Sequence, residues 1–167
     1  MSKAGVSIDR IAYILDEKEE DDRPGVTKPA INKDIVFDNV NFKYEEGAAV
    51  LKNVSFTVPA GKTFAILGNT GSGKSTLVHL LNRLYDLPDG CGKITIGGVD
   101  IRDIDRQYLR SQIGMVLQEP FLYSGSIKEN VGITRESSAF DDIREACEIA
   151  CVDSAIDSFT DGYETIV

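Results

Sequence analysis

A short glycine-rich segment contains the residue types that can hold a phosphate chain. It fits the phosphate-binding pattern G-x-x-x-x-G-K-[ST] at every fixed position. Its residues are Gly68, Asn69, Thr70, Gly71, Ser72, Gly73, Lys74, Ser75 and Thr76. Gly73 allows the backbone amides to approach phosphate oxygens where a side chain would collide. Lys74 would reach the β- and γ-phosphates, and Ser75 would offer its hydroxyl to Mg²⁺, so the segment predicts nucleotide phosphate binding.

The residues on either side of this loop provide the setting that the motif needs. An apolar run at residues 62–67 precedes it and is typical of a strand buried on both faces. A helical pattern begins at Lys74, and the amino-terminal end of such a helix adds partial positive charge next to the phosphates. A glycine-rich turn with a solvated lysine does not require this strand–loop–helix order, so we favour the nucleotide site.

Hydrophobic periodicity predicts strands first and then alternating strands and helices. This order indicates an α/β core with an antiparallel β portion beside it. Strands are predicted at residues 35–44, 54–58, 62–67, 93–96 and 113–117, and helices at residues 7–15, 74–85, 140–152 and 154–159. A charged run at residues 16–22, followed by Pro and Gly, reads as an exposed linker. We therefore divide the chain into a linker at 1–34 and a folded domain at 35–167.

Composition excludes several classes of function. The 167-residue chain has a formal net charge of -9, which argues against broad contact with nucleic acid phosphates. Its 3 cysteines form no disulfide framework, and Cys147 and Cys151 lack further ligands for a metal site. No apolar run approaches the roughly 18 residues of a membrane span. His79, the one histidine, is expected to pack or face solvent rather than to catalyse.

Hydrolysis of a bound nucleotide needs a second acid, and the sequence offers no convincing one. Such an acid normally ends an apolar strand and helps to hold Mg²⁺. The run at residues 149–153 ends in Asp153, but its neighbourhood has helical periodicity. The predicted strand at 113–117 is followed by Gln118 where an acid would be expected.

Several ordered motifs around the loop resemble the nucleotide-binding domain of ABC transporters. They are Tyr44 at the end of residues 40–44, the loop at 68–76, the segment 94–100, the segment 114–120, and the exporter-like segment 121–131. The resemblance runs from about residue 35 to 167, and residues 8–23 resemble the linker after the last membrane helix of such a transporter. It implies a P-loop NTPase core with a mainly parallel sheet flanked by helices.

The resemblance also implies roles for individual residues. Tyr44 would stack on the adenine of ATP, which suits an aromatic face. Gln118 would contact Mg²⁺ or the attacking water and report the nucleotide state, and is thus our candidate catalytic and metal-contacting residue beside Ser75. Residues 121–127 would face the transmembrane domain of the same transporter. A second nucleotide-binding domain would complete the site, at the cytoplasmic face of a membrane.

The family's later motifs, which include its signature sequence and a catalytic glutamate, are expected after residue 167. We therefore expect an N-terminal part of the domain that hydrolyses ATP negligibly by itself. Two alternatives remain open. One is another P-loop enzyme, a GTPase or small-molecule kinase, for which the guanine-reading Asn-Lys-x-Asp is missing after the loop. The other is a non-catalytic fragment that associates with itself through exposed apolar surface.

Overall fold

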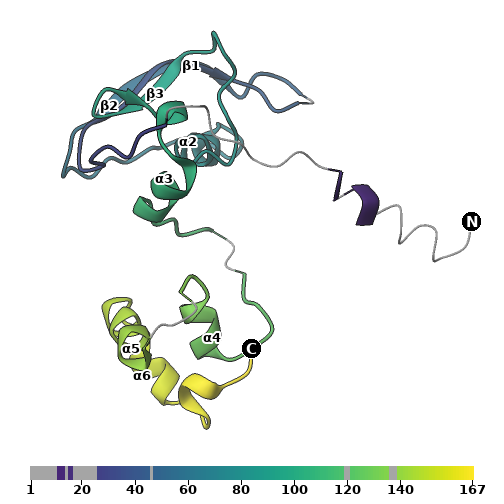
Figure 1. Ribbon diagram of the computed structural model, residues 1–167, viewed down its shortest axis with the longest axis vertical. Coiled ribbons are helices and arrows are strands. Elements are labelled where there is room, and N and C mark those ends of the chain that lie inside the picture. Colours follow the sequence, from purple (N-terminus) through teal and green to yellow (C-terminus); the bar gives the residue numbers. More distant parts are fainter. Residues whose placement is uncertain (1–10, 14, 17–25, 46, 119–120, 136–138) are drawn as a thin grey trace, which may run out of the picture. The chain divides into compact units, whose positions relative to one another are not determined.

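The computed structural model describes residues 11–13, 15–16, 26–45, 47–118, 121–135 and 139–167 (Figure 1). The chain forms two compact units, Met1–Gly114 and Met115–Val167, and each is treated separately below. Residues 11–13 and 15 are helical, and the rest of the helix predicted at 7–15 lies outside the described residues, as does most of the predicted linker at 16–22. Within the described part, no helix has the length and apolar character needed to cross a bilayer.

An antiparallel sheet of four strands, in the order β2-β1-β3-β4, forms the first unit. The strands are β1 (Ile35–Phe42), β2 (Leu51–Val58), β3 (Lys93–Ile96) and β4 (Val99–Asp100). Phe37 stands opposite Phe56 on β2 and Ile94 on β3, so β1 contributes to the core from the centre of the sheet. The antiparallel β portion predicted from the sequence is thus present, with β1, β2 and β3 close to their predicted positions.

The described residues from 26 to 114 also form two helices and one 3₁₀ turn. They are α2 (Lys74–Leu81), η1 (Ile101–Asp103) and α3 (Arg106–Gln112). Leu80 of α2 and Leu109 of α3 are fully buried in the same core cluster as Ile94. Figure 1 shows α2 and α3 in this unit below the strands. Apolar burial against the sheet therefore positions α2, whose amino-terminal end follows the glycine-rich loop.

Two predicted strands are not strands in the structure. Residues 62–67 and 113–117 have no strand assignment, and residues 62–69 are exposed throughout. The side chains of Leu67 and Val116 are 93% and 98% exposed. An apolar run indicates a tendency to be buried, but a strand also needs a partner for its backbone hydrogen bonds. Neither segment finds such a partner among the described residues, so both predictions were wrong.

Side chains of α3 hold the carboxyl-terminal end of α2. Arg110 donates to the carbonyl oxygens of Asn82 and Arg83, at 3.2 and 2.6 Å. Asp86, just beyond the helix, accepts hydrogen bonds from Arg83 and from Arg106, each at 2.9 Å. Cations near the last carbonyls of a helix are favourable because they offset its negative end.

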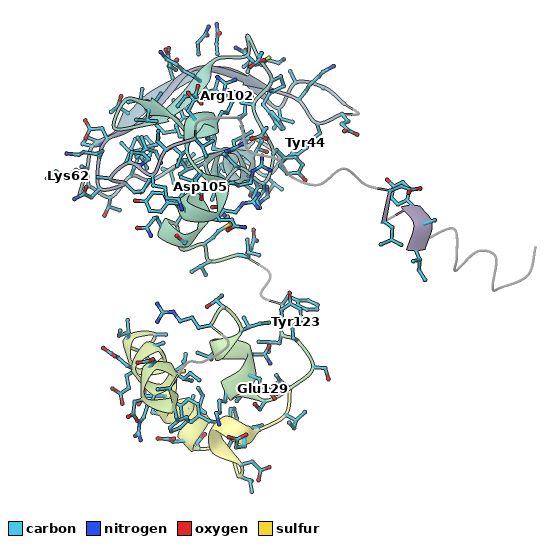
Figure 2. All side chains as sticks on the ribbon, in the orientation of Figure 1. Tyr44, Lys62, Arg102, Asp105, Tyr123 and Glu129 are labelled. Carbon is cyan, nitrogen blue, oxygen red and sulfur yellow. The ribbon has the colours of Figure 1, made fainter. Side chains whose placement is uncertain are left out.

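The second unit is helical. It contains α4 (Ile127–Gly132), α5 (Phe140–Ile149), α6 (Asp153–Asp157) and η2 (Gly162–Glu164). Its small core comprises Ile143, Cys147, Ile156 and Tyr163. The helices predicted at 140–152 and 154–159 correspond to α5 and α6, whereas α3 and α4 were not predicted. Figure 2 shows Glu129 in this unit, where it takes part in the cap of α4.

Candidate nucleotide-binding site

The Lys74 side chain folds back over the glycine-rich loop. Its ammonium group donates to the carbonyl oxygens of Gly68 and Asn69, each at 2.8 Å, and lies 3.4 Å from the hydroxyl oxygen of Ser72. The amide of Ser72 donates to the carbonyl oxygen of Asn69 at 3.2 Å, which closes the turn. The cation is therefore held in the loop before any ligand arrives.

Gly73, at the end of this loop, has a backbone conformation that favours glycine, and it has little space for a side chain. Gly73 has φ 88, a left-handed conformation that glycine adopts without strain. A Cβ atom there would come within 2.7 Å of Leu51 Cδ2 and 3.3 Å of the Val50 carbonyl oxygen. Loop and hairpin thus approach each other closely at Gly73, a contact that the motif did not predict.

The backbone amides at the amino-terminal end of α2 carry a partial positive charge. Its N-cap residue is Gly73, and no side chain caps the helix, so the first amides are available to an anion. A cleft of about 310 Å³ opens here, lined by Tyr44, Val50, Gly71, Gly73, Lys74, Ser75 and Thr76. This cleft therefore combines uncapped helix amides, the Lys74 cation and the hydroxyls of Ser75 and Thr76. All of these groups can bind phosphate oxygens.

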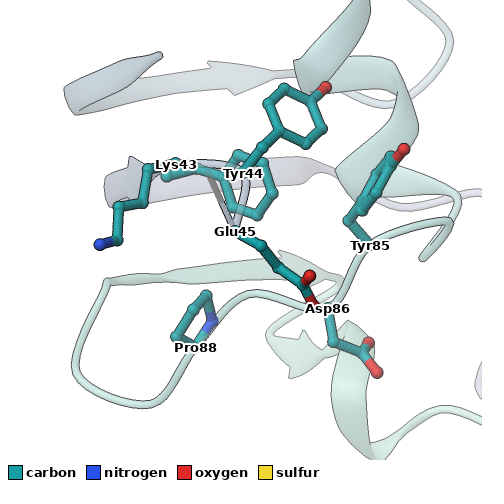
Figure 3. Close-up of a pocket in the computed structure, with 7 residues that line it drawn as sticks. Lys43, Tyr44, Glu45, Tyr85, Asp86 and Pro88 are labelled. Carbon is teal, nitrogen blue, oxygen red and sulfur yellow. The ribbon is translucent and has the colours of Figure 1, made fainter. Parts of the chain in front are cut away.

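Tyr44 lies at the same cleft, in the connection between β1 and β2 (Figure 2). Its hydroxyl is 3.0 Å from the Thr76 hydroxyl. The Tyr44 ring contacts Phe42 and Tyr85 edge-on, with ring centroids 5.1 and 5.0 Å away. A second pocket of about 690 Å³ adjoins these rings, and Figure 3 shows Tyr44 and Tyr85 on its wall with Asp86 and Pro88.

The structure brings Tyr44 to the same cleft as Gly71 and residues 73–76 of the loop, whereas the role of Gln118 stays a prediction. Gln118 is exposed and belongs to the other unit, Met115–Val167. Ile149 ends α5 and Asp153 begins α6, while residues 150–152 between them form neither helix nor strand. The run 149–153 is thus not an acid-ending strand, although the helix predicted across it is interrupted. The described residues contain no cluster of three or more His, Cys, Asp or Glu side chains that could hold a metal.

A family model described as ABC transporter matches residues 51–164, which is more than half of the chain. The chain belongs to the ABC transporter family. The match spans most of the chain, including the glycine-rich loop and α2, and it begins just after Tyr44 and Val50. The family resemblance predicted from the motifs is thereby confirmed.

Relatives of this ABC transporter chain are ATP-binding and permease proteins. A fatty acid ABC transporter ATP-binding/permease protein of Mycobacterium bovis is 44% identical over 161 residues, covering 96% of this chain and 25% of the relative. The human ATP-binding cassette sub-family B member 6 is 40% identical, covering 92% of this chain and 18% of the relative. The chain spans about a quarter of the length of the relatives that it matches.

A solved structure of a bacterial Atm1-family ABC exporter with ATP bound is similar in fold. It superimposes with a TM-score of 0.84 at 32% sequence identity, covering 97% of this chain and 29% of the exporter. The α/β P-loop fold class predicted from the sequence is therefore confirmed at the level of the family.

Three contributors to the site were not predicted from the sequence. Val50 lines the phosphate cleft, and Phe42 and Tyr85 support the ring of Tyr44. Tyr85 lies within the predicted helix at 74–85, but α2 ends at Leu81, and the chain then brings the Tyr85 ring back toward β1. Periodicity within a helix carries no signal for such a contact.

Proposed function

We propose that this chain is an ATP-binding part of an exporter-type ABC transporter ATPase. The observation that carries the proposal is the cradle at the start of α2. Lys74 and the uncapped helix amides stand in a cleft that Gly73 keeps open, and Tyr44 lies at its edge. An aromatic ring beside a triphosphate cradle suits a nucleoside triphosphate better than a free phosphate.

Each residue has a binding task in this proposal. Lys74 exchanges its contacts with the loop carbonyls for contacts with the β- and γ-phosphates. The first amides of α2 donate hydrogen bonds to phosphate oxygens, and Tyr44 presents its ring to the adenine. Ser75 offers a hydroxyl to Mg²⁺, which arrives with the nucleotide and neutralises charge on the phosphate oxygens. A single serine hydroxyl fits a cation whose other ligands are phosphates and water.

Coupling to transport is the second part of the proposal. We infer that residues 121–127 face a transmembrane domain and that Gln118 reports the nucleotide state to it. A second nucleotide-binding domain would face the first across the nucleotide, at the cytoplasmic side of a membrane. The support is that similar proteins are named as ATP-binding/permease proteins and as an exporter with ATP bound.

The 167-residue chain should bind MgATP and hydrolyse it negligibly, because the described residues place no acid beside Ser75 in the phosphate cleft. A steady ATPase rate in this chain that Lys74→Ala abolishes would contradict the statement on hydrolysis. Phosphate release over hours, measured beside a no-protein blank, checks it.

Titration calorimetry with MgATP tests the binding proposal. Lys74→Ala should weaken binding by at least about tenfold, because a charge-assisted contact to phosphate contributes about 1.5–3 kcal/mol. Lys62→Ala is the matched control, since Lys62 is exposed and outside the cleft. Equal affinities of the two variants would reject the phosphate site. Titration with MgGTP separates this proposal from a GTPase, for which GTP should bind more tightly than ATP.

A further inference from the structure

The hydroxyl groups of Tyr44 and Thr76 join two parts of the site that are 32 residues apart in sequence. Tyr44 lies outside β1, in the connection that closes where the Val50 amide donates to the Phe42 carbonyl oxygen at 2.8 Å. A residue in such a connection is not placed by the strand ladder. Its ring position depends on its side-chain contacts, which include T-shaped contacts with Phe42 and Tyr85 and this hydrogen bond.

Thr76 is placed independently of Tyr44. It lies in the first turn of α2 and is only 5% exposed. The Leu77 amide, next to it, donates to the Gly73 carbonyl oxygen at 3.1 Å, so the helix is regular at this point. Thr76 also lines the phosphate cleft. Thr76 therefore contacts Tyr44 through its hydroxyl and also borders the cleft where phosphates are expected.

We propose that Thr76 is a positioning residue for Tyr44, and that this hydroxyl pair couples the base site to the phosphate site. The inference rests on the proposed function. A threonine hydroxyl donates once and accepts through its lone pairs. When it donates to a phosphate oxygen, it accepts from the Tyr44 hydroxyl, and a charged acceptor at the end of such a chain strengthens both bonds. Phosphate binding thereby holds the ring in place for the adenine.

The proposed coupling predicts different changes in affinity for two ligands, one with a base and one without. Tyr44→Phe keeps the ring and removes the hydroxyl, so MgATP should bind about three- to tenfold more weakly, as for one neutral hydrogen bond. Magnesium tripolyphosphate has no base, so its affinity should stay within about twofold in this variant. Thr76→Val should weaken both ligands, and Thr76→Ser should restore MgATP binding because the hydroxyl returns.

Calorimetric titration of both ligands tests the proposal, with Tyr108→Phe as the matched control. Tyr108 also donates its hydroxyl, to the Pro29 carbonyl oxygen at 2.8 Å, but it is outside the cleft. Tyr44→Phe combined with Thr76→Val should bind MgATP no more weakly than Thr76→Val alone. Wild-type MgATP affinity in Tyr44→Phe, with Lys74→Ala still impaired, overturns the coupling and leaves the proposed function standing. Normal affinity in both variants overturns the proposed function as well.

Unfolding in urea tests the hydroxyl pair without any nucleotide. If the two hydroxyls bond to each other, the double variant should lose less stability than the sum of the single variants, with a coupling of about threefold in the unfolding equilibrium constant. Strictly additive losses overturn the positioning role, whatever the titrations give.

Discussion

The Lys74 ammonium group lies 2.8 Å from the carbonyl oxygen of Gly68, so the two ends of the glycine-rich loop are joined by a charge-assisted hydrogen bond. The same group bonds to the Asn69 carbonyl oxygen at the same distance. Because an ammonium group has three donors, a ligand phosphate can take the third, which otherwise makes only a 3.4 Å contact with Ser72 Oγ, or compete with the carbonyls. The loop is therefore organised by its own lysine before nucleotide binds.

Removal of this cation should loosen the loop even without nucleotide. We expect Lys74→Ala to accelerate amide hydrogen exchange at residues 70–73 by about three- to tenfold, since about one hydrogen bond's worth of local stability is lost. Hydrogen exchange followed by mass spectrometry measures this, with Lys62→Ala as the control. Unchanged protection of the loop would show that the backbone turn, rather than Lys74, organises it.

Substitution at Gly73 should be more damaging than substitution at Gly71. Both residues have left-handed φ angles, 88 and 80, so Ala costs about 1–2 kcal/mol of conformational strain at either position. Only at Gly73 would the added Cβ meet Leu51 and Val50, whereas nothing lies within 4 Å at Gly71. Thermal unfolding should therefore give a lower Tm for Gly73→Ala than for Gly71→Ala. Equal Tm values would mean that the hairpin shifts to accommodate the extra methyl group at little cost in stability.

The stability contributed by Asp86 should disappear in acid. Burial raises the pKa of this carboxyl, but the hydrogen bond and charge of Arg83 and the charge of Arg106 outweigh it and hold the pKa below its usual 3.8. The unfolded state then binds the proton more readily, so the stabilisation is present above about pH 4 and is lost as pH falls through the folded-state pKa.

Asp86→Asn tests this pH dependence. It should reduce the free energy of unfolding at neutral pH and have a smaller effect at about pH 3, measured by urea denaturation. Because the Asp86 side chain is 46% exposed, the effect at neutral pH should be modest. Asp38→Asn is the control in the same unit, since its pair with Lys93 is 3.7 Å long and exposed at both partners. A loss that is equal at both pH values would rule out an ionic origin.

The start of α4 has a reciprocal cap that should stabilise the second unit. The Ser126 hydroxyl accepts from the Glu129 amide at 3.1 Å, and the Glu129 carboxylate accepts from the Ser126 amide at 2.7 Å. Ser126→Ala should cost about 0.5–2 kcal/mol in a urea titration, as for other N-cap losses. Ser124→Ala, at an exposed position, should be silent. Equal stability of the two variants would show that α4 holds without its cap.

The exposed apolar side chains at Leu67 and Val116 should promote association of the chain. We expect concentration-dependent light scattering from the 167-residue protein, because exposed apolar side chains favour contact between copies. Leu67→Lys should reduce the scattering. Ile149→Lys, at another exposed apolar side chain, should have a smaller effect because it lies on a helix with paired backbone. A monomer at all concentrations would contradict this expectation.

Local sequence patterns predicted several elements of the structure. The periodicity of β1 and of α5 and the glycine-lysine motif before α2 all correspond to elements of the structure. The capping signature Ser126-x-x-Glu129 was present in the sequence and was not used, although it marks the start of α4. Asp105 likewise caps α3 through its bond from the Tyr108 amide at 2.7 Å.

Features that depend on distant parts of the chain were not predictable in the same way. The strands expected at 62–67 and 113–117 needed partners that apolar character alone does not supply. One motif was enough to predict the residues of the phosphate site. The Tyr44–Thr76 hydrogen bond could not be predicted in this way, because it depends on the path of the connection after β1. Sequence spacing therefore predicted which groups would contact the phosphates. Only the structure shows which neighbouring residues position those groups.

The contacts of Arg110 at the far end of α2 limit how nucleotide binding can be communicated. This guanidinium anchors the last carbonyls of the helix to α3, and Leu80 is fully buried beneath. The helix cannot recoil along its axis when an anion reaches its first turn. A structural response to the ligand must then be a rearrangement of loop residues 68–73 or a movement of α2 and α3 together. In either case, the distance between probes attached to α2 and to α3 should stay constant.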